Sequence, residues 1–231
     1  MKKFFCVTLT ACLLLTGCGD DESKAVDKTS VDKPHVDKPH VDKPHVDKPH
    51  VDKINIEQPS ADKPANVYME RMTDNYSKRN YSEAASDATE VIRQDPTNVD
   101  AYTYRGYIYS AQGKYPQAIA DLTKVIELAP NNVDAYAGRA IAFANMGDYN
   151  NAVADFDKAI ALNPLDPANY EGRGMVYGNM GDFAKALADF DRVIALRPTV
   201  EAYQRRGKCY EALGDSAKAQ ADFDKARELS K

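Results

Sequence analysis

Residues 133–166 read VDAYAGRAIAFANMGDYNNAVADFDKAIALNPLD, and residues 99–132 repeat the same arrangement as VDAYTYRGYIYSAQGKYPQAIADLTKVIELAPNN. The two segments share tyrosine in the fourth place, arginine in the seventh, alanine in the twentieth and proline in the thirty-second. In each segment a glycine ends a first predicted helix, and the proline stops a second one. Self-similarity at a fixed period of this length indicates a repeat architecture.

The same pattern extends in both directions from these two segments. The five blocks are 65–98, 99–132, 133–166, 167–199 and 200–231. The glycines that we expect after the first helices are Gly113, Gly147, Gly181 and Gly214. Aspartates that we expect to cap the second helices are Asp148, Asp182 and Asp215. The sequence therefore predicts five helix–turn–helix units.

The repeated places resemble the tetratricopeptide repeat family, whose pattern is an aromatic residue, a small residue, an aromatic residue, Ala-x-x-x-Phe and a proline. The aromatic residue in the fourth place is Tyr68, Tyr102, Tyr136, Tyr170 and Tyr203. The resemblance covers residues 65–231 and implies an all-α, right-handed α-solenoid of five repeats. It also implies a concave groove, lined by the first helices, that binds a protein segment.

The resemblance assigns five places of each repeat to this groove. The residues in those places include Thr103, Tyr107, Ile141, Asn145, Met175, Asn179, Gln204 and Lys208. Tyr107, Ile141 and Met175 would form an apolar stripe along the groove, or else pack between neighbouring helices. Asp100 and Asp134 at the rim favour a ligand that carries lysine or arginine, and they do not fit the carboxylate clamp of some family members.

An arginine and an aspartate recur in every block, and the arginine stands where the family usually has leucine. The arginines are Arg71, Arg105, Arg139, Arg173 and Arg206, and the aspartates are Asp87, Asp121, Asp155, Asp189 and Asp222. Five recurrences of both partners predict a ladder of helix-to-helix ion pairs, partly desolvated and structural in role. The alternative is a row of surface arginines without partners.

The last repeat differs from the others in two places that are otherwise apolar. Gln220 and Arg227 stand where the first four blocks carry residues such as Val153 and Ile160. Because a solenoid must present polar groups on its final face to stay soluble, we expect the fifth repeat to serve as its own cap.

The first eighteen residues indicate a bacterial lipoprotein leader. Lys2 and Lys3 precede an apolar run that is too short to span a bilayer, and the segment 1–17 is interpreted as a signal peptide. The sequence Leu-Thr-Gly-Cys at 15–18 resembles a lipobox, which implies acylation of Cys18. An ordinary secretory leader with a chance cysteine is the alternative. Because Asp20 lies one place beyond the position that favours inner-membrane retention, we expect the outer membrane, facing the periplasm, in a diderm bacterium.

Residues 18–64 are predicted to be a lipid-anchored, disordered linker. Four copies of Val-Asp-Lys-Pro-His fill residues 31–50, a composition with too little apolar area to offset chain entropy. All four histidines of the chain lie there, at His35, His40, His45 and His50. Their spacing does not favour a preformed metal site, so we expect no bound metal, although a metal-binding envelope protein stays an alternative function.

Composition excludes several functional classes. Residues 65–231 contain no histidine and no Gly-rich phosphate loop, and their single cysteine, Cys209, is expected to be a packed apolar side chain. With a net charge of −5 and no basic cluster, nucleic-acid binding is not favoured. We therefore expect a monomeric scaffold or adaptor of the cell envelope, neither an enzyme nor a cofactor protein. A pilotin-like assembly factor for a pilus or secretion system is the second interpretation.

Overall fold

The computed structural model describes residues 64–231. The predictions on the signal peptide, on Cys18 and on the histidine-containing linker lie outside the described residues. Within the described part the fold is all-α, and none of its helices is long and apolar enough to cross a membrane. The ten helices are α1 (Ala65–Ser77), α2 (Tyr81–Gln94), α3 (Val99–Ala111), α4 (Tyr115–Leu128), α5 (Val133–Asn145), α6 (Tyr149–Leu162), α7 (Pro167–Asn179), α8 (Phe183–Leu196), α9 (Val200–Ala212) and α10 (Ser216–Leu229).

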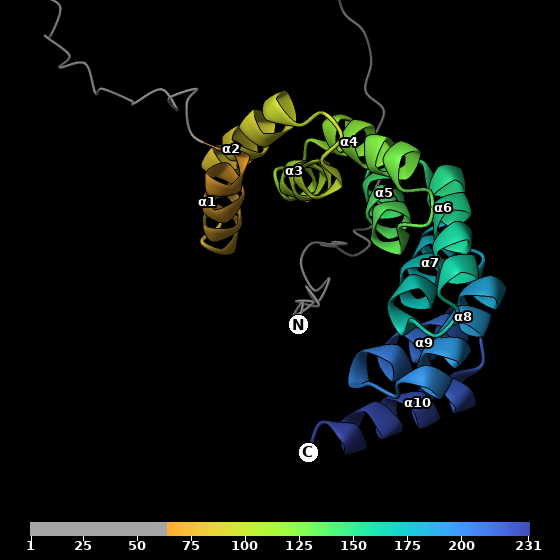
Figure 1. Ribbon diagram of the computed structural model, residues 1–231. Helices are drawn as coiled ribbons and strands as arrows, with labels where there is room; N and C mark the ends of the chain where they lie inside the picture. Colours follow the sequence, from red (N-terminus) through yellow and green to blue (C-terminus); the bar gives the residue numbers. More distant parts are fainter. Residues whose placement is uncertain (1–63) are drawn as a thin grey trace, which may run out of the picture. The chain divides into compact units, whose positions relative to one another are not determined.

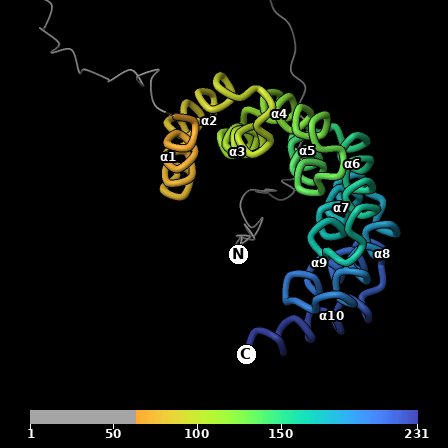
Figure 2. Tube along the Cα trace, viewed as in Figure 1, coloured from red at the N-terminus to blue at the C-terminus, as the bar shows by residue number. Residues whose placement is uncertain are grey.

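The helices form five successive antiparallel pairs, and each pair falls within one of the predicted blocks (Figure 1). Every second helix packs on its own first helix and, where another repeat follows, on the first helix of that repeat. First helices also meet directly, α3 with α5 and α5 with α7. The tube view shows the odd-numbered helices following one another along one side of the array (Figure 2). We call the surface of this side the first-helix face.

Side chains at the helix starts explain where most of the helices begin. Asn98 and Asn132 accept a hydrogen bond from a backbone N–H in the first turn of α3 and α5. The predicted caps of the second helices are confirmed, because Asp148, Asp182 and Asp215 accept from first-turn N–H groups of α6, α8 and α10. Each such bond satisfies a donor that the helix itself leaves unpaired.

The turn inside each pair needs a left-handed residue. Gly113, Gly147, Gly181 and Gly214 have φ between 72° and 80°, as expected for the residue that follows a helix C-cap. In the first repeat Arg79 takes this position with φ 63°, which is uncommon for a residue with a side chain.

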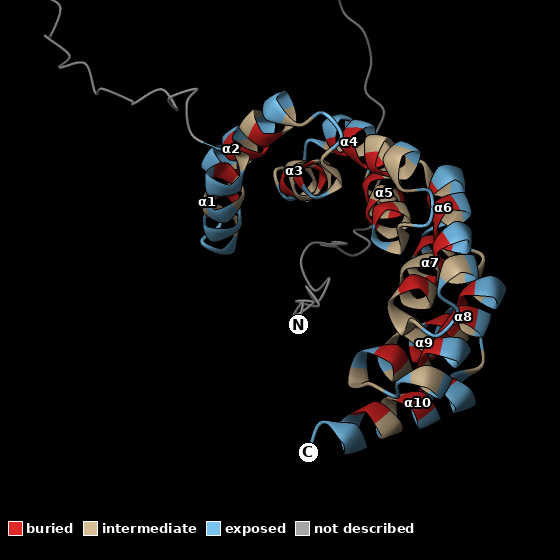
Figure 3. Ribbon diagram, viewed as in Figure 1, coloured by how far each residue is buried: buried red, intermediate tan, exposed pale blue. Residues whose placement is uncertain are grey.

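The core is a narrow band between the helix layers, built mainly from small side chains (Figure 3). The alanine in the twentieth place of each repeat is buried, at Ala84, Ala118, Ala152, Ala186 and Ala219. The two helices of a repeat come close together at a glycine of the first helix. A Cβ on Gly106 would lie 2.9 Å from Leu122 Cγ. The absence of a side chain there lets α3 and α4 pack without a gap.

Candidate functional site

A ladder of arginines joins the two helices of every repeat. In the third repeat, Arg139 on α5 donates from Nε to Asp155 Oδ2 at 2.8 Å and from Nη2 to Asp155 Oδ1 at 2.8 Å. The same two-pronged geometry recurs in the other repeats, and the five aspartates are all buried. The structure thus brings together every arginine–aspartate pair that the sequence predicts. Bidentate bonds to a carboxylate are stronger than neutral hydrogen bonds and fix orientation.

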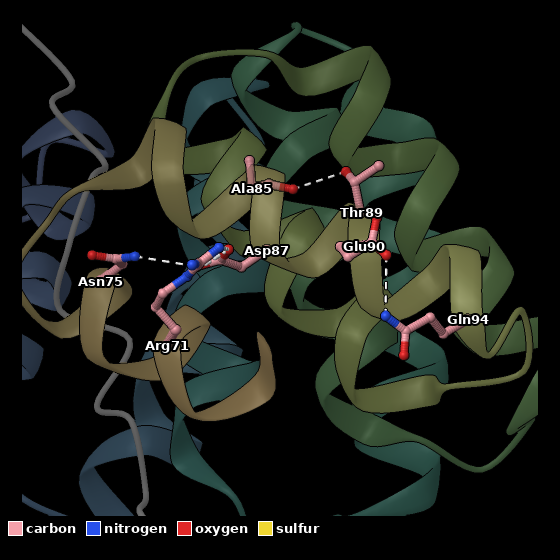
Figure 4. A network of polar contacts seen from close by, with 7 residues as sticks. All are labelled: Arg71, Asn75, Ala85, Asp87, Thr89, Glu90 and Gln94. Carbon is pink, nitrogen blue, oxygen red and sulfur yellow. Dashed lines mark hydrogen bonds and ion pairs between the residues drawn. The ribbon is translucent and has the colours of Figure 1, made fainter. Parts of the chain in front are cut away.

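The first pair has an additional partner, which comes from the same helix as its arginine. Figure 4 shows Arg71 bound to Asp87, with Asn75 donating to the same carboxylate. Asn75 stands where later repeats have an aromatic residue. Arg71 is correspondingly the most exposed arginine of the ladder, at 39%.

Each later arginine also reaches back to the preceding repeat, a contact that the sequence pattern did not lead us to predict. Arg105 Nη1 donates to Thr89 Oγ1 at 3.0 Å, and Arg139 Nη1 donates to Thr123 Oγ1 at 2.9 Å. In the last two repeats the acceptors are carboxylates: Arg173 binds Asp157, and Arg206 binds Asp191. The signal was present in the sequence, since all four acceptors share the twenty-fifth place. One guanidinium therefore ties together three helices.

Aromatic rings flank the arginines from both sides. The guanidinium of Arg105 lies 5.6 Å from the ring centroid of Tyr102 and 5.9 Å from that of Tyr109. The fourth and eleventh places supply the same pair of rings in repeats three to five. Such contacts add a cation–π attraction to the ion pair.

Hydrogen bonding to the aspartates raises the pKa of the ladder arginines above the usual value, most strongly for Arg173 and Arg206. Burial raises the pKa of Asp189, while its hydrogen bond to Arg173 acts in the opposite direction. The ladder arginines and aspartates are all hydrogen-bonded to one another, which supports a structural role for them. In residues 64–231, no cluster of three or more His, Cys, Asp or Glu side chains could hold a metal ion.

On the first-helix face, Tyr107 is half-buried and spans two repeats. Its hydroxyl donates to the backbone oxygen of Asp134 at 3.2 Å, and burial raises the pKa of the phenol. The ring lies over Gly138, where a Cβ would stand 2.7 Å from Tyr107 Cε1. Much of this side chain therefore packs between α3 and α5.

The neighbouring groove positions are also partly occupied by contacts within the array. Ile141 packs against the core cluster that contains Phe156, and Met175 packs against the cluster that contains Phe190. Thr103 Oγ1 donates to the backbone oxygen of Val99, and Asn145 donates to that of Ile141. The apolar stripe is consequently half-buried, and its polar neighbours already have partners.

The C-terminal part of the face offers more accessible groups. Asn179, Gln204 and Lys208 are exposed. Asp100 and Asp134 are exposed too, and no cationic side chain of the described residues lies within ion-pair distance of either carboxylate. The predicted groove residues thus divide into a packed group and an accessible group.

A second accessible row was not anticipated from the sequence. Met146, Met180 and Leu213 are 52%, 45% and 51% exposed, and each directly precedes the left-handed glycine of its repeat. The signal that would have revealed this row is an apolar residue in the fourteenth place of three consecutive blocks.

Cys209 is buried on α9 and packs with Ala186 and Phe190. Burial raises the pKa of its thiol, which disfavours the nucleophilic thiolate.

Comparison with known proteins bears on the whole array. One model of the tetratricopeptide repeat matches residues 99–132 and 133–165, and a second model of the same repeat matches residues 171–231. The chain belongs to the tetratricopeptide repeat family. None of the curated proteins gives a significant match to the sequence.

Solved structures with a similar fold include a structure described as MamA protein, with 29% identity, a TM-score of 0.66, and coverage of 71% of this chain and 91% of that one. MamA from Desulfovibrio magneticus RS-1 gives 21% identity and a TM-score of 0.68, covering 72% of this chain and 94% of that one. A tetratricopeptide repeat protein of Thermus thermophilus gives 19% identity and a TM-score of 0.58, covering 72% of this chain and 91% of that one.

The family consists of scaffolds for protein–protein interaction that are typically not enzymes, so the chain is a scaffold with protein partners.

Proposed function

We propose that this scaffold is an adaptor held at the bacterial cell envelope by lipid on Cys18, and that it binds a protein segment along its first-helix face. The observation that carries the binding site is the pair of exposed carboxylates, Asp100 and Asp134, which come from successive first helices and have no ion-pair partner among the described residues. Exposed charges without internal partners can steer a ligand of opposite charge and fix its register.

The accessible groups of this face suit an extended, basic segment. Two acidic side chains come from successive first helices, α3 and α5, and the exposed amide of Asn179 on α7 follows them along the face. The half-buried rings and aliphatic groups between them leave apolar surface for the segment's uncharged side chains.

Position-specific photo-crosslinking tests the binding face. A photoreactive residue at Asn179, exposed on α7, should form one dominant protein adduct in living cells, because it lies on the proposed ligand path. Lys158, exposed on α6 at the opposite helix layer, is the matched control and should form none. Equal adducts from both positions would contradict binding on the first-helix face.

Removing the two acidic charges of the face is the second part of this test. Changing both Asp100 and Asp134 to asparagine should weaken the Asn179 adduct and reduce its sensitivity to salt, since the ligand would lose two ionic contacts. An adduct of unchanged yield and unchanged salt dependence would show that the carboxylates do not contact the ligand.

The anchor is tested separately. We expect the Cys18→Ser variant, once exported, to leave the membrane fraction, because the lipobox-like sequence is the only feature of the chain that we assign to membrane attachment. A variant that still pellets with membranes after a salt wash would refute lipid anchoring without bearing on the binding face.

A further inference from the structure

A hollow of about 300 Å³ lies at the last repeat, between the start of α9 and the end of α10. Its lining residues are Val200, Gln204, Phe223, Ala226, Arg227 and Ser230. Phe223 and Ala226 supply the apolar floor, whereas Gln204, Arg227 and Ser230 are exposed at the edge. An apolar centre with a polar rim is the usual anatomy of an interaction site.

The corresponding places in earlier repeats are docking surfaces for a helix. Leu122 holds the place of Phe223 in repeat two, and a Cβ on Gly138 of α5 would lie 3.3 Å from Leu122 Cδ1. Val125, which corresponds to Ala226, clusters with Ala135 of the same helix α5. The next first helix therefore covers this surface wherever another repeat follows.

The other junctions repeat the arrangement. Phe156 lies against Gly172 of α7, where a Cβ would meet the ring. Val91 clusters with Ala101 of α3. Glu171, the counterpart of Gln204, pairs with Arg205 of α9 at 3.4 Å. The hollow on α9 and α10 thus continues a series of helix-docking sites, and the described residues leave this last one open.

The interior junctions also define the charge of the expected occupant. At each of them the incoming arginine donates to the twenty-fifth place of the preceding repeat, as Arg206 does to Asp191. On α10 that place is Asp224, which is 55% exposed. Its present partners, Gln220 and Arg227, belong to the same helix and are themselves exposed. An exposed pair of this kind is easily exchanged for a better one.

We propose that this end of the array is a second binding site, which takes an amphipathic helix of a partner protein. The helix carries two small residues three positions apart and an arginine directly after the second one, the pattern of Ala135, Gly138 and Arg139 in α5. The small residues lie over Phe223 and Ala226, and the arginine binds Asp224. A second copy of the chain fits less well, because α1 places the branched Val67 where the docked helices α3, α5 and α9 carry the buried alanines Ala101, Ala135 and Ala202.

A synthetic peptide with the sequence of residues 133–145 is the probe, held helical by a side-chain bridge because isolated helices of this length are marginal in water. Fluorescence anisotropy of the labelled peptide, titrated with the full chain, should show saturable binding. The Asp224→Arg variant should bind about tenfold more weakly, because an attraction becomes a repulsion. Asp224 is exposed, and circular dichroism should show unchanged helicity.

Charge reversal on the peptide supplies the rescue. The peptide with Arg139→Glu should bind the Asp224→Arg protein and lose affinity for the unchanged protein, whereas the Lys158→Glu protein should bind the original peptide normally. Changing Asp100 and Asp134 to asparagine should leave this affinity intact, which separates the end site from the first-helix face.

Three outcomes would overturn the proposal. The first is no binding of the original peptide, and the second is equal binding of a peptide with Ala135→Phe, because Ala135 is the residue that packs on the counterpart of Ala226 in the interior junction. The third is self-association of the full chain in sedimentation that Asp224→Arg abolishes while the peptide fails to compete. That result would assign the end surface to a second copy.

Discussion

At the scale of single residues, the ladder arginines join neighbouring helices through hydrogen bonds and ring contacts, whereas a leucine in the same place would join them by apolar packing alone. Arg139 binds a buried carboxylate in its own repeat, a hydroxyl in the preceding repeat and two aromatic rings. A buried ion pair is not by itself evidence of high stability, because desolvation offsets much of the attraction. It does make the loss of one partner costly, since the other charge stays buried.

The Arg139→Ala variant tests this asymmetry. Asp155 is 7% exposed and would be left without its cation. Removing one partner of a fully buried pair costs roughly 3–5 kcal/mol, and because Arg139 keeps some solvent contact we expect a smaller loss, about 2–3 kcal/mol. The measurement is denaturant unfolding followed by circular dichroism.

Lys124→Ala is the matched control, because Lys124 pairs with Glu127 at a site where both side chains are exposed. Its free energy of unfolding should change by less than about 1 kcal/mol. If both variants unfold at the same denaturant concentration, the ladder does not stabilise the array.

Cys209 gives a second prediction at this scale. Because burial raises the pKa of its thiol and shields it, iodoacetamide at a pH of about 8 should label Cys209 at least roughly tenfold more slowly in the native protein than in denaturant. Peptide mapping by mass spectrometry distinguishes this cysteine from the others. Fast native labelling would mean that α9 is less firmly packed than the structure shows.

At the scale of elements, the helices and their caps were predictable because their signals are local. Asp148 lies directly after Gly147, and a glycine followed by a cap can be read from two adjacent letters. The ladder partners were also predictable, since both recur at fixed places. The contact of Arg139 with Thr123 was missed, because the twenty-fifth place changes from threonine to aspartate along the array and its role depends on how one repeat stacks on the previous one.

The orientation of Tyr107 shows the same limit. The place of Tyr107 in the repeat predicts that it lines the groove. Gly138 on the next first helix has no side chain, and the ring of Tyr107 packs into the space that this leaves. Only the combination of two helices from different repeats decides how much of the ring stays accessible. The exposed residues of the face, by contrast, follow directly from helix periodicity.

Two glycines of α7 test this packing between elements. A Cβ on Gly172 would meet the Phe156 ring, whereas one on Gly178 would meet nothing within 4 Å. We expect Gly178→Ala to stabilise the array by about 0.5–1 kcal/mol through helix propensity. Gly172→Ala should instead destabilise it by up to roughly 2 kcal/mol, because overpacking outweighs the same gain.

Thermal or denaturant unfolding of both variants provides the comparison, and the difference between them removes the shared propensity effect. A Gly172→Ala protein that is stabilised as much as Gly178→Ala would show that Phe156 can move away from α7 without cost.

At the scale of the whole molecule, the sequence divides the chain at about residue 64 into a repetitive polar segment and a repeat array. The array is quasi-one-dimensional, so each repeat depends on its neighbours and on the arginines that join them. We expect residues 18–64 to contribute reach and no stability, because the Val-Asp-Lys-Pro-His units offer too little apolar area to bury.

Limited digestion with a protease that cleaves before aspartate tests this division. Aspartate occurs in every pentapeptide unit of residues 31–50 and also throughout the array, so the same bond type is compared in both parts. Trypsin is less suitable, because proline follows the lysine of each unit and hinders cleavage. We expect rapid cleavage in the linker and a resistant fragment that begins near residue 65, because opening a helix inside the array requires breaking its packing and its ladder contacts.

The most informative internal bond of this digest precedes Asp95, which lies in the turn between α2 and α3, at the first junction between repeats. A turn can open without unwinding a whole helix, so this bond reports how firmly the first repeat is held to the second. Mass spectrometry of the early products gives the order of cleavage, and we expect cutting at Asp95 to follow cutting at Asp47 by a long interval. Equal rates at the two bonds would mean that the first repeat opens independently of the rest, and that the stable array begins at the second repeat.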